Sequence, residues 1–264
     1  MKVYISADIE GVTNVTHWDE TELGHHTHAA AAAQMRREVL AACRGAIKAG
    51  ATEIYVKDAH DSARNIPFEN MPEEVTLIRG WTNTPESMMA GVDASFDAVI
   101  YIGYHSAAYM NGNPLAHTMN TGNNYVKING EYAAEFDLNS IIAEHYGVPV
   151  VFLSGDRALC EHAQEKVPAM ETVGVKWGWG NATFNMSTDK AEQLIEEGVE
   201  KALAKRAECH YPTYDRYEME INYKEHVPAT RASFYPGVEQ LDQRTVRFAS
   251  SDPMAMVTAR MFIL

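Results

Sequence analysis

Residues 1–11 read MKVYISADIEG, and the rest of the chain is organised around this stretch. Val3 and Ile5 alternate with polar neighbours, which predicts a first β-strand. Side chains two residues apart in a strand share a face, so Asp8 and Glu10 point the same way from its end. Neighbouring carboxylates resist joint burial unless a cation lies between them. The pair is either half of a metal site or two exposed acids, and taken alone it favours exposed acids.

The composition is that of an ordinary globular protein, with 264 residues of which 46% are hydrophobic. Its net charge of −14 gives an acidic surface that repels phosphate backbones, so no nucleic-acid partner is expected. No apolar run is long enough to span a membrane, and the chain starts with a strand rather than a signal peptide. Cys43, Cys160 and Cys209 are widely spaced, which fits free thiols in a reducing compartment. We therefore expect a cytoplasmic protein without a membrane partner.

Strand-like and helix-like patterns alternate along almost the whole chain. Residues 97–103 contain a buried strand of the parallel-sheet kind, and residues 29–48 carry apolar side chains at helical spacing. This alternation predicts an α/β fold with a mainly parallel sheet flanked by helices. Pro212 marks a break in this pattern of predicted strands and helices. We therefore expect an α/β catalytic core over 1–211 and a smaller C-terminal α/β extension packed on it over 212–264.

The remaining elements follow from the same patterns. An Asn129-Gly130 turn between two short runs predicts a β-hairpin over 125–132. Further strands are predicted over 52–57, 75–78, 148–153, 172–176, 217–223 and 245–249, and further helices over 136–146, 158–166, 188–206 and 253–264.

A histidine-rich segment lies between the first strand and the first helix, with His17, His25, His26 and His28. Histidine tracts can bind metals. Thr27 could instead cap the helix that follows, and we prefer this interpretation of the segment as a helix entrance.

Residues of metal-ligand type follow three of the predicted strands, at the sheet edge where open α/β sheets bind ligands. These residues are Asp8 with Glu10, His60 and His105, and Glu135 opens a helix. Such a mixture of oxygen and nitrogen donors suits zinc, with manganese or cobalt possible, better than magnesium or calcium. Five ligands exceed the needs of one catalytic zinc. The set suits two metals that share a bridging carboxylate.

Other polar residues near these positions each have more than one candidate role. Asp58 and Asp61 flank His60 and could orient it, although Asp61 could equally cap a helix. His117 lies in a Gly/Asn/Pro-rich loop over 110–124. It could stabilise an oxyanion or pass a proton to a leaving amine, or it could be an ordinary surface histidine.

Five short segments, taken in order, resemble one known family. They are Ser-Ala-Asp8-Ile-Glu10-Gly, Lys-Asp58-Ala-His60-Asp61-Ser, Gly103-Tyr-His105, Ala-His117-Thr-Met and Ala-Glu135-Phe-Asp-Leu-Asn139. Together they resemble the D-aminopeptidase family of dinuclear zinc peptidases, of the dipeptide-transport operon type. The resemblance runs from residue 1 to about 156 and is weaker beyond.

The resemblance implies that two zinc ions are held by Asp8, Glu10, His60, His105 and Glu135, with Asp8 as the bridge. It implies that His117 is catalytic without being a ligand. It also implies a ring-shaped homo-oligomer with enclosed active sites. The apolar tail Met261–Leu264 could lie in a subunit contact, but core packing of the last helix is the simpler expectation.

Two alternatives remain beside a cytoplasmic zinc aminopeptidase that acts on short peptides with an N-terminal D-residue. Asp8-Ile-Glu10-Gly-Val-Thr13 is similar to the Asp-x-Asp-Gly-x-Thr signature of haloacid-dehalogenase-like phosphohydrolases, which use magnesium. The second acid of that signature is Asp, and it has no place for His60 or His105. The other alternative is a non-catalytic metal- or peptide-binding protein, which would not need His117.

Overall fold

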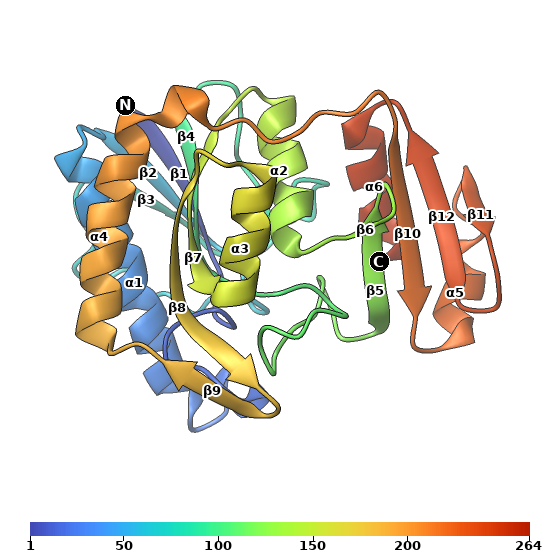
Figure 1. Ribbon diagram of the computed structural model, residues 1–264, viewed down its shortest axis with the longest axis horizontal. Helices are drawn as coiled ribbons and strands as arrows, with labels where there is room; N and C mark the ends of the chain where they lie inside the picture. The colour runs from blue at the N-terminus through green and yellow to red at the C-terminus, as the bar shows by residue number, and fades with distance from the viewer.

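The computed structural model describes residues 1–264 and contains two β-sheets, which lie side by side in Figure 1. The larger sheet has seven strands in the order β3-β2-β1-β4-β7-β8-β9. Neighbouring strands in it are parallel except for the edge pair β8 and β9. Its strands are β1 (Lys2–Ala7), β2 (Glu53–Asp58), β3 (Val75–Ile78), β4 (Ala98–Tyr104), β7 (Val150–Asp156), β8 (Glu171–Trp179) and β9 (Ala182–Asn185).

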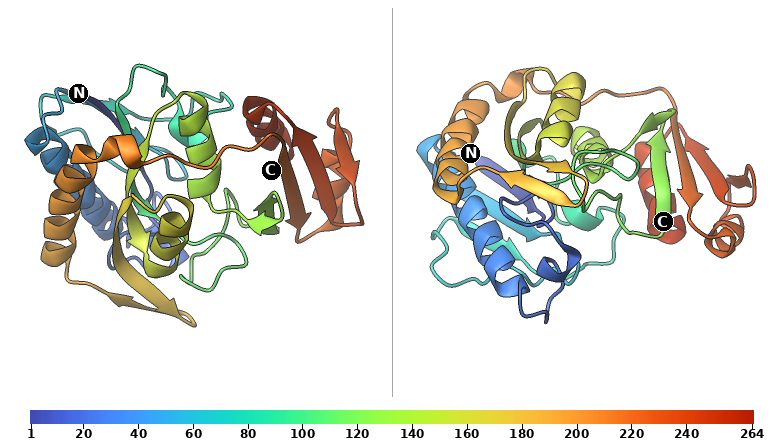
Figure 2. Two further views of the ribbon diagram at one scale, coloured as in Figure 1. Left: turned by 45° about the horizontal axis from the view of Figure 1, so that its top comes forward. Right: turned by 60° about the horizontal axis from the view of Figure 1, so that its bottom comes forward.

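Two helices cover each face of this sheet (Figures 1 and 2). Helices α1 (His28–Lys48) and α4 (Thr188–Ala204) pack together on one face, and α2 (Glu135–His145) and α3 (Arg157–Lys166) cover the other. The strands β4 and β7 are buried along their whole length, as parallel strands between two helical layers must be. The predicted α/β fold with a mainly parallel sheet flanked by helices is confirmed.

The smaller sheet is antiparallel and has the order β11-β12-β10-β5-β6. It carries α5 and α6. The elements of this part are β5 (Asn123–Ile128), β6 (Glu131–Tyr132), β10 (Tyr217–Tyr223), α5 (His226–Ala232), β11 (Val238–Gln240), β12 (Thr245–Ser250) and α6 (Pro253–Ile263), and the 3-10 turns of the chain are η1 (Trp18–Glu20), η2 (Ser87–Met89) and η3 (Arg206–Glu208).

The predicted hairpin, β5 with β6, forms one edge of the smaller sheet. Asn129 and Gly130 have φ angles of 52° and 87°, the positive values that a two-residue hairpin turn of this type requires. The strand β5 then pairs with β10, so the smaller sheet combines a hairpin from the middle of the chain with the C-terminal segment. The division into 1–211 and 212–264 stays a prediction, and the smaller sheet draws strands from both parts.

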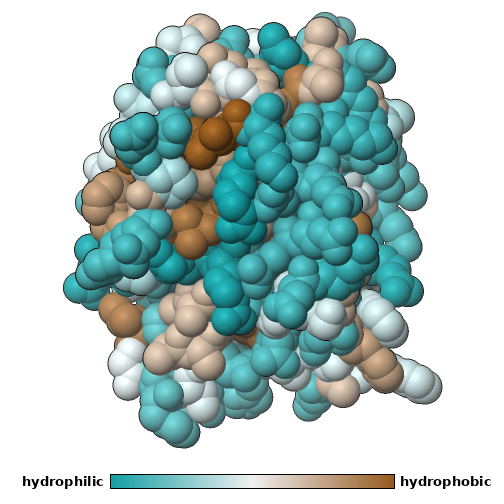
Figure 3. All heavy atoms as spheres, turned by 90° about the vertical axis from the view of Figure 1, so that its left-hand side faces the viewer, coloured by the Kyte–Doolittle hydropathy of each residue, from teal (hydrophilic) through white to brown (hydrophobic).

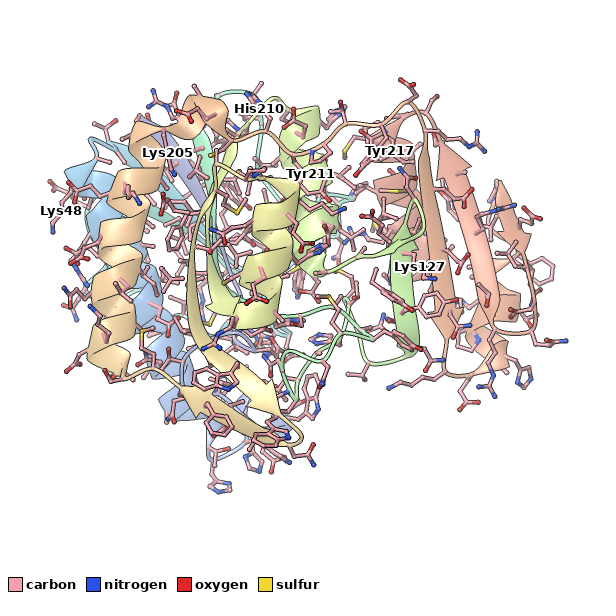
Figure 4. All side chains as sticks on the ribbon, viewed as in Figure 1. Lys48, Lys127, Lys205, His210, Tyr211 and Tyr217 are labelled. Atoms are coloured by element: carbon pink, nitrogen blue, oxygen red, sulfur yellow. The ribbon has the colours of Figure 1, made fainter.

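The segment from α4 to β10 runs past α2, and Figure 4 places His210 and Tyr211 on it. Tyr211 donates a hydrogen bond to the Asp137 carboxylate over 2.8 Å, which fastens this segment to the first turn of α2.

No helix of the structure is both long and apolar enough to cross a membrane.

The outer face of the α1–α4 layer is mostly hydrophilic, with small scattered apolar spots (Figure 3). Arg44 and Lys48 of α1 pair there with Glu196 of α4, and Figure 4 shows Lys48 projecting outward. Exposed pairs of this kind add little stability. This face is therefore an ordinary solvated surface.

Candidate metal centre

Three adjacent strands of the larger sheet end at one edge, and each is followed by predicted ligands. Asp8 and Glu10 follow the central strand β1, His60 follows β2 and His105 follows β4. Helix α2 begins at the same edge with Glu135. All five side chains are buried. The fold thus gathers five residues that are spread over about half of the sequence.

Two glycines allow the ends of β1 and β4 to lie against each other. Gly11 donates its N–H to the carbonyl of Gly103 over 2.8 Å, and a Cβ on Gly11 would lie 1.8 Å from the Tyr104 carbonyl oxygen. Gly103 has a φ of +71°, and a Cβ there would lie 2.2 Å from the Asp8 carbonyl oxygen. Only glycine fits such approaches. They fix the position of Asp8 relative to β4.

The Asp8 carboxylate lies between two imidazoles. Its Oδ1 is 3.2 Å from His60 Nδ1, and its Oδ2 is 3.4 Å from His105 Nε2. Glu10 Oε2 is 3.1 Å from the same His60 nitrogen, and Glu135 Oε2 is 3.5 Å from the same His105 nitrogen. One oxygen of Asp8 therefore faces each half of the cluster, which is the placement that a bridging carboxylate needs.

Each imidazole of the cluster is held by a hydrogen bond from its other ring nitrogen. His60 Nε2 donates to the carbonyl of Thr21 over 2.8 Å, and His105 Nδ1 donates to the carbonyl of Ser106 over 3.0 Å. A carbonyl oxygen can only accept, so these nitrogens carry the hydrogen. In the neutral ring, the nitrogen facing the carboxylates then presents a lone pair. Metal-binding histidines are oriented in this way.

An imidazole lone pair and a carboxylate oxygen that face each other repel unless a cation, either a proton or a metal ion, lies between them. Glu10 Oε2 and His105 Nε2 are buried without a hydrogen-bond partner, which is an expensive state. Burial lowers the pKa of the His60 and His105 imidazoles, but the surrounding carboxylates raise it more, and both values end well above the usual range. The cluster therefore attracts positive charge, and its mixed donors fit zinc.

His117 joins the cluster from the loop after β4. Its ring stacks on that of His105 with centroids 4.3 Å apart, and its Nε2 lies 3.6 Å from Glu135 Oε1. Its Nδ1 donates to the carbonyl of Leu115 over 2.9 Å, so the neutral ring also offers Nε2 as a lone pair. Donor atoms of His105, His117 and Glu135 lie within 4.8 Å of one another. This geometry permits either proton transfer or metal binding by His117.

A cavity of about 640 Å³ opens over the cluster. It is lined by Asp8, Glu10, His60, His117 and Glu135, together with residues of the segment 81–88 and of helix α6. The tail Met261–Leu264 differs from its expected core packing, because only Ile263 is buried while Met261 and Leu264 line the cavity. The end of α6 packs against the mouth of the site because the smaller sheet positions it there.

Asp58 does not have the orienting role that its place beside His60 allowed. The Asp58 carboxylate accepts hydrogen bonds from the backbone N–H groups of Asn65 and Ile66 over 2.6 and 2.8 Å, and makes none to the His60 ring. It folds the loop after β2 instead, and Asn65 Nδ2 donates to the His60 carbonyl over 2.9 Å. Asp61 makes no hydrogen bond to the His60 ring either, and its backbone carbonyl accepts one from Trp81 Nε1 over 2.7 Å.

Two residues that support the backbone at Glu10, Lys176 and Asn113, were not predicted from the sequence. The buried Lys176 of β8 donates to the carbonyls of Glu10 and Val15, and Asn113 donates to the Glu10 carbonyl over 2.9 Å. Burial lowers the pKa of Lys176 to about 8, against the opposing charges of Asp156 and neighbouring acids. These contacts hold the backbone that carries Glu10. A lone lysine in a predicted strand gave no signal of this role.

The four histidines of the histidine-rich segment lie outside the metal-ligand cluster and do not line the cavity. His17 accepts from Asp19 N–H over 3.2 Å and caps η1, and His28 bonds to Asn65 Oδ1 over 3.0 Å. Thr27 occupies the N-cap position of α1, but its side chain makes no capping hydrogen bond, because its hydroxyl donates to the Asp19 carbonyl instead. The helix-entrance interpretation therefore describes this segment better than a metal tract does.

Comparisons with known proteins point to one family. A family model described as D-aminopeptidase (Peptidase_M55) matches residues 1–262. The D-aminopeptidase of Bacillus subtilis (strain 168) is 29% identical over 255 residues, which cover 96% of this chain and 92% of that protein. The solved structure of DppA from Bacillus subtilis, a Zn-dependent D-aminopeptidase and self-compartmentalizing protease, matches with a TM-score of 0.92 at 28% identity. That match covers 100% of this chain and 96% of the other.

Proposed function

Because the chain belongs to the D-aminopeptidase family, we propose that it is a zinc-dependent aminopeptidase that releases N-terminal D-amino acids from short peptides. The observation that carries this proposal is the buried cluster in which imidazole lone pairs face carboxylates beside a cavity. A cavity of about 640 Å³ falls in the usual range for small-ligand sites. It has room for a short peptide.

Two zinc ions per chain account for the number and arrangement of the donors. Glu10 and His60 form one half of the cluster, Glu135 and His105 form the other, and Asp8 faces both. When bound, zinc ions in such a pair supply hydroxide at neutral pH and polarise the scissile carbonyl. The buried carboxylates also offset the charge of the ions, so that the centre can form away from bulk water.

His117 is the group we assign to proton transfer. Its hydrogen bond to the Leu115 carbonyl fixes the hydrogen on Nδ1, so Nε2 is free to take a proton from the attacking water. The resulting imidazolium can pass that proton to the leaving amine, because His117 lines the cavity. Stacking against His105 keeps the ring in place during the transfer.

The two alternatives, a magnesium phosphohydrolase and a non-catalytic binding protein, explain the site less well. Magnesium avoids imidazole ligands, and the cluster contains at least two imidazoles, so a magnesium phosphohydrolase does not explain the site. A non-catalytic binding protein does not explain why His117 is oriented over the cluster by its own backbone hydrogen bond.

A panel of matched substrates tests the proposed activity. The zinc-loaded protein should hydrolyse D-alaninamide and D-alanyl dipeptides, and it should act slowly or not at all on their L-enantiomers. Release of ammonia or of the second amino acid measures the turnover. Equal turnover of both enantiomers would overturn the stereochemical part of the proposal, and no turnover of either would overturn the aminopeptidase itself.

We also propose a ring-shaped homo-oligomer, built through the β8–β9 hairpin. This hairpin projects from the body in Figure 1 and exposes three aromatic rings that stack on one another. Trp177 is 39% exposed, Trp179 77% and Phe184 43%. Exposed aromatic clusters are typical of subunit contacts.

The proposed localisation is cytoplasmic, which fits the three free, buried cysteines.

Light scattering tests the oligomer. The wild-type mass is expected to be a multiple of the 29.4 kDa chain, and the double variant Trp179→Ser, Phe184→Ser should dissociate toward smaller species. Phe234→Ser is the matched control, because it removes a ring that is 84% exposed elsewhere, between α5 and β11. A wild-type monomer at micromolar concentration would contradict the ring, and an unchanged mass of the double variant would contradict the hairpin contact.

A further inference from the structure

Helix α6 places a buried cation in the wall of the cavity. Arg260 is only 3% exposed, and it is the only arginine or lysine that lines the cavity. Its Nη2 donates to the Pro85 carbonyl over 2.6 Å, its Nη1 approaches the weak acceptor Met119 Sδ at 3.5 Å, and its Nε has no partner. No carboxylate forms an ion pair with it. A buried guanidinium without a counterion is costly, so this one is short of an anion.

The Arg260 side chain remains charged at neutral pH. Burial lowers its pKa to about 10, while Glu135 and Glu86 act in the opposite direction. The protein thus keeps a cation at this wall despite the cost of its burial. A ligand that enters the cavity with a negative group would offset that cost.

Arg260 lies on the Glu135 side of the metal centre. Met119 connects the two, since its N–H donates to Glu135 Oε1 over 2.7 Å and its sulfur contacts the guanidinium. On the other side, Asp61 follows His60 and also lines the cavity. The cavity is therefore acidic beside His60 and basic beyond Glu135. A short peptide has the same polarity, with an ammonium group at one end and a carboxylate at the other.

Resting on the proposed function, we propose that Arg260 binds the C-terminal carboxylate of a dipeptide substrate and so selects dipeptides over amides. The guanidinium fork matches a carboxylate in two parallel hydrogen bonds. One residue beyond the scissile bond spans about 3.5 Å. A dipeptide carboxylate therefore stays close to the metal centre, and Arg260 is linked to the Glu135 carboxylate through Met119 alone.

The test compares two substrates that differ only in the distal group, D-alanylglycine and D-alanylglycinamide. The wild type should hydrolyse the free acid with a kcat/KM about 10- to 100-fold higher, the worth of one hydrogen-bonded charge. Arg260→Gln should lose this preference, with kcat/KM for the free acid falling to that for the amide, whose own value should change little. Arg247→Gln is the matched control at an exposed arginine of β12, and it should keep the wild-type ratio.

Each other outcome overturns the inference. An equal loss on both substrates would mean that Arg260 supports the transition state or the fold instead, and no loss on either would mean that it does not contact the substrate. If Arg260→Gln does not fold, the wild-type ratio still decides, because a wild type that does not distinguish the two substrates contradicts carboxylate binding. A wild type that hydrolyses neither substrate overturns the proposed function itself, which separates the two failures.

Discussion

Replacing Asp8 with asparagine is expected to remove at least one metal ion and essentially all activity. Asp8 is the only carboxylate with one oxygen toward each half of the cluster, at 3.2 Å from His60 and 3.4 Å from His105. Asparagine keeps the shape, but it loses the negative charge and replaces one oxygen donor by an amide nitrogen. Without the shared charge, two dications would repel each other across the centre.

The control for this variant is Asp97→Asn. The Asp97 carboxylate accepts a hydrogen bond from the backbone N–H of Lys2 over 2.7 Å, at the opposite end of β1. An asparagine oxygen can still accept that bond, so metal content and turnover should match the wild type. An Asp8→Asn protein with full metal content and normal turnover would show that Asp8 is not the bridge.

Replacing His117 with alanine is expected to lower turnover by about 100- to 10,000-fold, the usual contribution of a general acid–base group. The variant should retain both metal ions, because the remaining five donors are sufficient for them. Substrate binding should change little. Metal analysis and steady-state kinetics on the same preparation measure both properties.

His210→Ala is the control for the His117 variant. His210 lies on the segment between α4 and β10 in Figure 4, and its only hydrogen bond is to the carbonyl of Ala207. It should keep its metal and its activity. Loss of metal from His117→Ala would make His117 a ligand, as its 3.6 Å distance from Glu135 permits. Full activity of that variant would move proton transfer to another group.

Most strands of the two sheets were predictable from local patterns. The strand Val75–Ile78 and the strand Tyr217–Tyr223 have the predicted bounds, because each is a run of alternating or apolar residues between clear breaks. The short strands β9 and β11 were missed. They have three or four residues each and are stabilised by their neighbours rather than by their own sequence. The pairing of β5 with β10 joins residues 91 to 100 positions apart in the sequence, which no local pattern can predict.

The candidate centre was predictable for a different reason. In a parallel sheet the strand ends meet at one edge, so ligand types that follow three strands must lie together. Arg260 and Lys176 follow no such rule. Arg260 resembles any basic residue in the last turn of a helix, and its place at the cavity depends on how the smaller sheet docks beside the larger one.

The metal content of the purified wild-type protein tests the central claim most directly. Inductively coupled plasma mass spectrometry, with protein concentration from amino-acid analysis, gives the number of ions per chain after removal of loosely bound metal. We predict close to two zinc ions per chain. A value near one, or magnesium alone, would contradict the dinuclear centre formed by Asp8, Glu10, His60, His105 and Glu135.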